Sequence, residues 1–149
     1  MVCVVQAAPV YLDLERSVDK ALTLIEQAAG DGAKLIAFPE LWLPGYPWWV
    51  WLNGIEWAHQ KGLSQRYLEQ ALDFEGLQAG RIARAAADHR IQVLMGTAER
   101  EGEHLYIAQW LVDETGRTLL RRRKLKPGPL ELKVFGEGGA QDLPVVNTA

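Results

Sequence analysis

The chain of 149 residues has the length of one ordinary domain, and its composition is that of a folded protein. Hydrophobic residues make up 48% and charged residues 23%, which excludes a disordered chain. Sixteen Lys and Arg against nineteen Asp and Glu give a net charge of −3, which argues against a general nucleic-acid binder. A single cysteine, Cys3, excludes an internal disulfide framework and a cysteine-based zinc cluster.

The sequence carries neither a targeting signal nor a membrane span that we recognise. No basic segment precedes an apolar run at the start of the chain, so we expect no signal peptide. The longest apolar stretch, residues 41–52, is interrupted by proline and glycine and is far shorter than the roughly 18–20 residues of a membrane span. We therefore expect a soluble, cytoplasmic α/β protein with no membrane partner.

The N-terminal part predicts a strand–helix–strand unit. Residues 2–8 are apolar and β-branched without alternation, which predicts a strand buried on both faces. Asp13 can cap a helix whose apolar residues keep helical spacing until two glycines end it. Residues 34–38 predict a second short buried strand, so we expect parallel pairing through a right-handed crossover.

The later part predicts further elements and then a long loop. The predicted elements are helices at residues 65–72 and 77–89, a strand at 91–96, and a hairpin of 104–112 with 118–123. Residues 124–144 are rich in Pro and Gly and predict a loop, after which Val145 and Val146 begin what could be another strand. A loop of this length is usually functional or unfinished, so the pattern is that of one domain that stops mid-architecture.

Tryptophan is concentrated in one segment, with five of the six between Trp42 and Trp57. Because tryptophan buries a large area and needs a partner for its indole N–H, such a cluster is typical of a core or a subunit contact. The same side chains could instead line a ligand pocket. The sequence leaves both interpretations open.

Several common catalytic constellations are missing from the sequence. Neither serine lies in a G-x-S-x-G turn, and no Walker or dinucleotide-binding sequence occurs. The three histidines show no metal-ligand spacing. We therefore expect no metal and no nucleotide cofactor.

Three charged residues follow predicted strands. Glu40 ends a buried strand beside an aromatic loop, where a poorly solvated carboxylate is suited to proton transfer, although it could merely cap the loop. The basic run 121–126 could be a solvated strand end or a nucleic-acid contact, or one of its lysines could stabilise a developing anion. Two carboxylates sharing one lysine can tune a base, but spacing alone leaves open whether Glu40, Lys124 and Glu131 meet.

The same residues resemble the nitrilase, or carbon–nitrogen hydrolase, superfamily. Residues 38–49 (FPELWLPGYPWW) resemble its glutamate motif, and residues 122–127 (RRKLKP) resemble its lysine motif. Residues 4–21 are similar to its opening strand and helix, and residues 127–146 match the stretch that leads towards its nucleophile. The resemblance covers essentially the whole chain in order, and the Tyr-Pro-Trp-Trp continuation looks like nitrilases more than amidases.

The resemblance implies an α-β-β-α sandwich, of which residues 1–149 would be the N-terminal portion of a single domain. It implies that Glu40 is the general base, that Lys124 stabilises the tetrahedral intermediate, and that Glu131 supports Lys124 and the substrate. The nucleophilic cysteine would lie beyond this chain, because Cys3 belongs to the opening strand and is expected to be a small buried hydrophobe. Neither a metal nor an organic cofactor is implied.

The aromatic residues Tyr46, Trp48 and Trp49 are the expected substrate contacts. Two departures near Glu131, Pro129 where nitrilases usually have His and Leu132 where Arg is common, bear on local geometry and substrate preference. The Trp-rich loop hints at an arylaliphatic or hydrophobic aliphatic side chain on the substrate.

The expected activity is hydrolysis of an organic nitrile to a carboxylic acid and ammonia. A cyanide-degrading enzyme, an amidase, and a non-catalytic or split subunit of the same fold remain alternatives. The resemblance also implies a homo-oligomer or a complementary C-terminal polypeptide as partner. Half a sandwich would expose apolar surface, so we expect the chain alone to be inactive and prone to associate.

Overall fold

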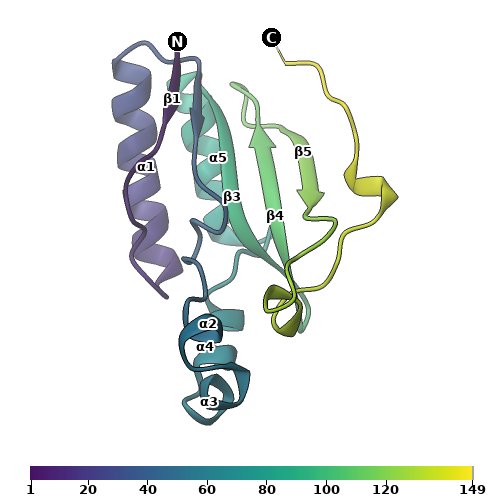
Figure 1. Cartoon of the computed structure of the whole chain (residues 1–149). Helices are drawn as coiled ribbons and strands as arrows, with labels where there is room; N and C mark the ends of the chain where they lie inside the picture. Colours follow the sequence, from purple (N-terminus) through teal and green to yellow (C-terminus); the bar gives the residue numbers. More distant parts are fainter. Residues whose placement is uncertain (149) are drawn as a thin grey trace.

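The computed structural model describes residues 1–148 and contains a five-stranded sheet with two long helices on one face (Figure 1). The strands are β1 (Val2–Val4), β2 (Leu35–Ala37), β3 (Gln92–Glu101), β4 (His104–Val112) and β5 (Thr118–Arg123). The helices are α1 (Leu14–Gly30), α2 (Trp49–Leu52), α3 (Ile55–Gln60), α4 (Leu63–Glu69) and α5 (Leu77–His89). Two 3-10 turns follow, η1 (Glu131–Lys133) and η2 (Ala140–Asp142).

The strands lie across the sheet in chain order, from β1 to β5. The first three strands are parallel, and β4 and β5 continue the sheet as antiparallel strands. The parallel pairing of the first two strands and the hairpin of β4 with β5 are as predicted. Strand β3 runs well past its predicted end at residue 96, because β4 pairs with it from Val93 up to Glu101, which lies opposite His104.

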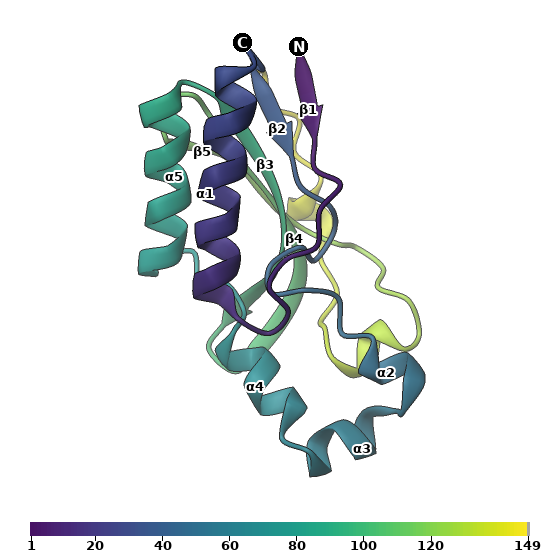
Figure 2. The same ribbon diagram turned by 90° about the vertical axis from the view of Figure 1, so that its left-hand side faces the viewer.

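The main core lies between the sheet and the pair α1 and α5, which pack side by side on one face (Figure 2). Helix α1 begins where predicted, since the Asp13 carboxylate accepts a hydrogen bond from the Arg16 backbone N–H at 3.0 Å. Its buried stripe includes Val18 and Ile25, which face Ile82 of α5 in the same core. Helix α5 has the predicted bounds.

The opposite face of the sheet is bare at its β1 edge. Val2 and Val4 are 64% and 73% exposed, so the prediction of a first strand buried on both faces is wrong. The physical reason is that the helices cover one face only among residues 1–148. The strand also ends at Val4, and the segment at Val145 and Val146 forms no strand, because it pairs with none of the described strands.

Three short helices, α2 to α4, gather beyond one end of the sheet (Figure 1). Only α4 was predicted, at residues 65–72 instead of the observed Leu63–Glu69. Gly54 and Gly62 separate the three helices with positive φ angles of 83° and 69°. A second buried cluster joins this unit to η1, through Tyr67 packed edge-on between Trp49 and Phe135. None of the helices in residues 1–148 is long and apolar enough to cross a membrane.

Candidate active site

The structure brings Glu40, Lys124 and Glu131 together at one end of the sheet. Glu40 follows β2, Lys124 follows β5, and Glu131 opens η1. The Lys124 Nζ lies 3.3 Å from both carboxylate oxygens of Glu40. It also lies 3.2 Å from Oε1 and 3.0 Å from Oε2 of Glu131. One ammonium group is thus held between two carboxylates, the arrangement that the sequence left open.

Glu131 is a buried carboxylate whose acceptor positions are filled. Its side chain is 8% exposed. The Gly128 backbone N–H donates to Oε2 at 2.6 Å, and the Tyr46 hydroxyl donates to Oε1 at 3.0 Å. Burial alone would raise the pKa of Glu131, but the hydrogen bonds from Gly128, Lys124 and Tyr46 outweigh it and lower the pKa below its ordinary value. Glu131 is therefore a fixed anion.

Lys124 is correspondingly held in its charged form. Burial works to lower the pKa of its ammonium group, yet the hydrogen bonds and charges of Glu131 and Glu40 outweigh that effect and raise it. A cation of this kind stays available to attract negative charge on a neighbouring molecule. The third member differs, since the Glu40 side chain is 50% exposed. The expectation that Glu40 is poorly solvated is wrong for the described residues, because none of them covers its outer side.

A glycine in β3 determines how closely the Glu40 segment can approach the sheet. A Cβ at Gly96 would collide with the backbone carbonyl oxygen of Pro39 and would lie 2.8 Å from the Glu40 Cα. The segment continues along β3, where the Leu43 N–H donates to the Gly96 carbonyl at 3.2 Å. Only glycine leaves room for this contact, so Gly96 sets the position of Glu40. Gly96 was not among the site residues predicted from the sequence.

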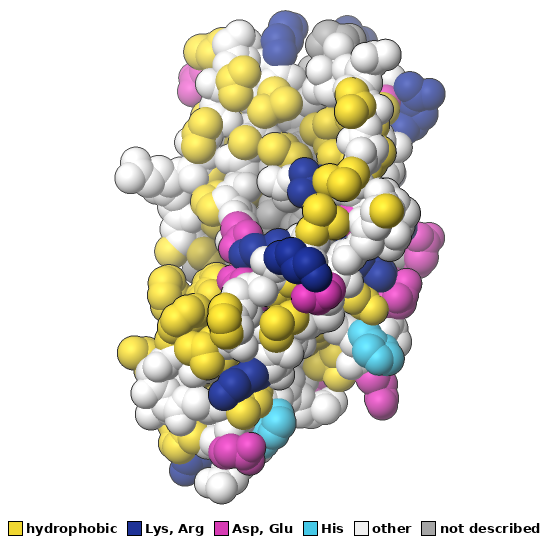
Figure 3. All heavy atoms as spheres, turned by 45° about the vertical axis from the view of Figure 1, so that its right-hand side comes forward, with side chains coloured by type: hydrophobic (Ala, Val, Ile, Leu, Met, Phe, Trp, Pro, Cys, Tyr) yellow, Lys and Arg dark blue, Asp and Glu magenta, His cyan; other side chains and the backbone are white. Residues whose placement is uncertain are grey.

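Two hollows open on either side of Glu40. One, of about 310 Å³, is largely apolar and has Tyr46 and Trp48 in its wall together with Tyr11. The other, of about 160 Å³, is bounded by Glu40 and Lys124 and by Arg122 on β5. Figure 3 shows basic and acidic side chains gathered across the middle of the view, with hydrophobic side chains above and below them.

The predicted substrate contacts fall into two groups. The structure places Tyr46 and Trp48 beside Glu40, with their ring centroids 4.7 Å apart and Trp48 61% exposed. Trp49 lies elsewhere, 5% exposed in the second buried cluster against Tyr67, so the structure does not bring it to the charged residues. Trp42 is also buried, and its indole N–H donates to the Ala7 carbonyl. The tryptophan segment thus serves both the core and the candidate site.

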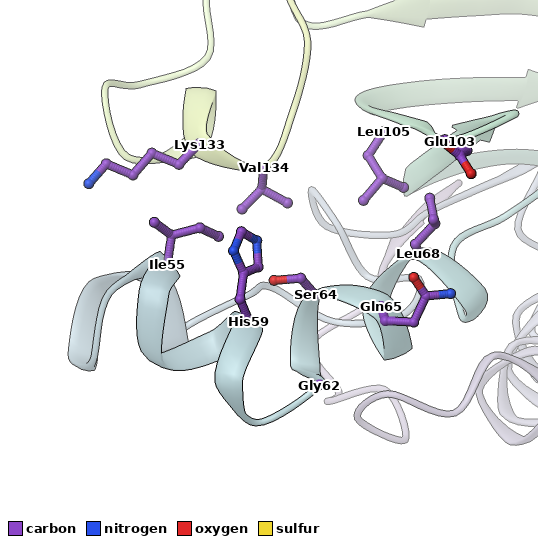
Figure 4. Close-up of a pocket in the computed structure, with 10 residues that line it drawn as sticks. All are labelled: Ile55, His59, Gly62, Ser64, Gln65, Leu68, Glu103, Leu105, Lys133 and Val134. Carbon is purple, nitrogen blue, oxygen red and sulfur yellow. The ribbon is translucent and has the colours of Figure 1, made fainter.

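A larger hollow of about 360 Å³ lies between α3, α4, η1 and the start of β4 (Figure 4). The His59 and Ser64 side chains point towards it, whereas the Lys133 ammonium group points away. None of Glu40, Lys124 and Glu131 lines it. Within residues 1–148 no group of three or more His, Cys, Asp or Glu side chains is placed to hold a metal ion.

A comparison with protein families identifies the family of this chain. The carbon–nitrogen hydrolase family model matches residues 1–149. The chain belongs to the carbon–nitrogen hydrolase family.

Individual relatives place the chain nearer to nitrilases within that family. It is 49% identical over 147 residues to a nitrilase of Pseudomonas syringae pv. syringae, covering 99% of this chain and 43% of the relative. It is 47% identical to an arylacetonitrilase of Aspergillus niger, covering 95% and 41%. The chain thus spans about two fifths of the length of these relatives, and the match is to their N-terminal part.

A solved structure shows the same fold. A mutant of the Nesterenkonia AN1 amidase, from the nitrilase superfamily, superposes with a TM-score of 0.69 at 24% identity. The match covers 93% of this chain and 48% of the amidase. The sheet with α1 and α5 is therefore the corresponding portion of a nitrilase-superfamily fold, as the sequence predicts.

Proposed function

We propose that this chain supplies the glutamate and lysine residues of a nitrilase-type active site, which converts an organic nitrile to a carboxylic acid and ammonia. The observation that carries the proposal is the Lys124 ammonium group held by two carboxylates of different character. The nitrilase relatives support the reaction class, and the resemblance of residues 122–146 to the superfamily supports a cysteine nucleophile outside this chain.

In the proposed reaction Glu40 is the general base, because its half-exposed carboxylate keeps acceptor capacity that Glu131 lacks. Glu40 takes the thiol proton as sulfur bonds to the nitrile carbon, and the electron pair released to nitrogen takes up a proton, giving a thioimidate. Lys124 stabilises the negative charge of the tetrahedral intermediate that forms when water adds. Ammonia then leaves, and a second water hydrolyses the acyl-enzyme to the acid.

The apolar hollow beside Glu40 is the proposed site for the substrate side chain. Tyr46 and Trp48 line it, which is consistent with substrate contacts there, while the burial of Trp49 suits it to supporting the loop from within the core. The aromatic wall favours an arylaliphatic nitrile, and one of the relatives is an arylacetonitrilase. The exposed sheet face at Val2 and Val4 is where a further layer of a sandwich, or a complementary polypeptide, would pack.

The test uses a hybrid polypeptide in which this chain is continued by the C-terminal part of the Pseudomonas syringae nitrilase. Ammonia release is measured from phenylacetonitrile, from cyanide and from phenylacetamide. We expect phenylacetonitrile to be the best substrate and Glu40→Gln to lose at least 99% of the turnover, roughly the loss of a general base, with Glu26→Gln on the exposed side of α1 as a matched control. Preference for the amide or for cyanide would reassign the reaction, and full activity of Glu40→Gln would overturn the role of the base.

A further inference from the structure

A chain of hydrogen bonds leads from the surface to the buried glutamate. The Trp51 indole N–H donates to the Tyr46 hydroxyl oxygen at 3.0 Å, and the Tyr46 hydroxyl donates to Glu131 Oε1 at 3.0 Å. Glu131 in turn holds Lys124 through both carboxylate oxygens. Hydrogen bonds thus join four side chains in one line. They come from α2, from the loop before it, from η1 and from the residue that follows β5.

The chemistry of the donors fixes the direction of every bond in this line. An indole nitrogen can only donate, whereas a tyrosine hydroxyl has one proton to donate and lone pairs that accept. Because the Trp51 indole can only donate, it does not compete for the single Tyr46 proton, which is donated to Glu131. Burial, the largest influence, raises the pKa of Tyr46, so that proton is present across the neutral range.

Trp51 is not one of the buried residues of its helix. Its side chain is on a helix of only four residues and is 52% exposed. Its neighbours Trp49 and Val50 supply the buried contacts of that helix, at 5% and 4% exposure. The directed contact that Trp51 makes is its hydrogen bond to Tyr46.

We propose that Trp51 is a positioning residue for nitrile hydrolysis, which acts through Tyr46 to hold Glu131 ionised and aligned on Lys124. The inference rests on the proposed function and deepens it. With Glu131 saturated by Gly128, Tyr46 and Lys124, the ammonium of Lys124 keeps one orientation towards the substrate, and Glu40 remains the carboxylate with spare acceptor capacity. Loss of Trp51 frees the Tyr46 hydroxyl to rotate away from Glu131.

A double-mutant cycle in the hybrid enzyme tests this coupling. We expect Trp51→Phe to lower kcat for phenylacetonitrile about five- to tenfold with KM little changed, and Tyr46→Phe to lower it about 10- to 100-fold. The double variant should match Tyr46→Phe alone, because Trp51 acts through the hydroxyl that this variant already lacks. Trp57→Phe on α3 is the matched control, since Trp57 is 37% exposed and donates no hydrogen bond within residues 1–148.

Additive losses, or a Trp51→Phe effect equal to that of Trp57→Phe, would overturn the proposal. A measurement made without substrate tests the coupling of Trp51 to Glu131 independently of the proposed nitrilase function. In the hybrid labelled with ¹⁵N-tryptophan, the Trp51 indole N–H signal should shift as Glu131 takes up a proton at a pH below the ordinary glutamate range, and Tyr46→Phe should remove that shift. An indole signal that ignores this titration in the active hybrid would refute the coupling while leaving the nitrilase function intact.

Discussion

The segments that follow β2 and β5 each deliver one glutamate to Lys124, but they surround it differently. Glu131, after β5, is 8% exposed and accepts hydrogen bonds from a backbone amide and a tyrosine as well as from the lysine. Glu40, after β2, is 50% exposed, and Lys124 is the donor that the structure gives it within residues 1–148. Two identical side chains on one cation are therefore suited to different tasks. The saturated one fixes the lysine, and the open one can exchange a proton.

The largest effect should come from removing the open carboxylate. In the hybrid enzyme, Glu40→Gln should lower kcat/KM for phenylacetonitrile about 10²- to 10⁴-fold, the range typical of a lost general base. Its unfolding temperature should stay close to that of the parent, because Glu40 is half-exposed. Steady-state kinetics and a thermal melt measure the two quantities. A variant that loses activity because its unfolding temperature falls below the assay temperature would contradict the assignment of Glu40 as the general base.

A change beneath the Glu40 segment should disturb both structure and activity. Gly96→Ala places a methyl group against the Pro39 carbonyl and the Glu40 backbone, so the segment must move. We expect a loss of about 1–3 kcal/mol in unfolding free energy. We also expect kcat to fall, because Glu40 is displaced while Glu131 stays in place. Denaturant unfolding of the hybrid checks this, with Gly80→Ala in α5 as the control, since a Cβ there meets nothing within 4 Å. Equal behaviour of both variants would show that Gly96 does not limit the approach.

Removing the saturated carboxylate should cost stability where Glu40→Gln does not. Glu131→Gln leaves the Gly128 amide and the Lys124 ammonium with a weaker acceptor in a buried place. We expect a loss of about 1–3 kcal/mol, compared with less than about 0.5 kcal/mol for Glu40→Gln. Paired urea titrations of the two hybrid variants give the difference directly. A reversal of their order would remove the distinction between the two glutamates.

The smallest effect is in the pH dependence of stability. Because the folded-state pKa of Glu131 is lowered, its stabilisation is present above the ordinary glutamate value near 4.3 and is lost as the pH falls through the folded value. The pKa of Lys124 is raised, so its contribution persists until the pH climbs past the ordinary lysine value near 10.4. Thermal melts of the parent and Glu131→Gln should therefore converge only in acid, and parallel curves from neutral pH to pH 3 would contradict this.

Local signals predicted the parts of the fold that local interactions determine. Asp13 starts α1 as a helix cap, and the spacing of Ile82 and its neighbours gives α5 its bounds. The run from Trp49 to Leu52 is apolar throughout and shows no helical period, so α2 could not be predicted. The prediction that Glu40 is poorly solvated was wrong because the exposure of a side chain depends on which distant segments cover it. The residues next to Glu40 in the sequence do not specify those segments.

The sequence named the three charged residues of the candidate site but not their connections. Motif resemblance selected Glu40, Lys124 and Glu131, yet their meeting requires that β2 and β5 end at the same edge of one sheet, across two intervening strands. The bond from Trp51 to Tyr46 had no signal in the sequence, because it spans the start of α2, which could not be predicted. The link from Tyr46 to Glu131 is a tertiary contact between residues 85 positions apart in the sequence, which no local pattern predicts.

The order of the strands has a consequence for how the protein is made. Each strand from β2 onward hydrogen-bonds to the strand that precedes it in the chain. Within residues 1–148, each of these strands therefore finds a partner that has already been synthesised. During synthesis the sheet can therefore grow by one strand at a time as the polypeptide leaves the ribosome. Lys124 is synthesised after all five strands, so Glu40 leaves the ribosome well before the lysine that it contacts.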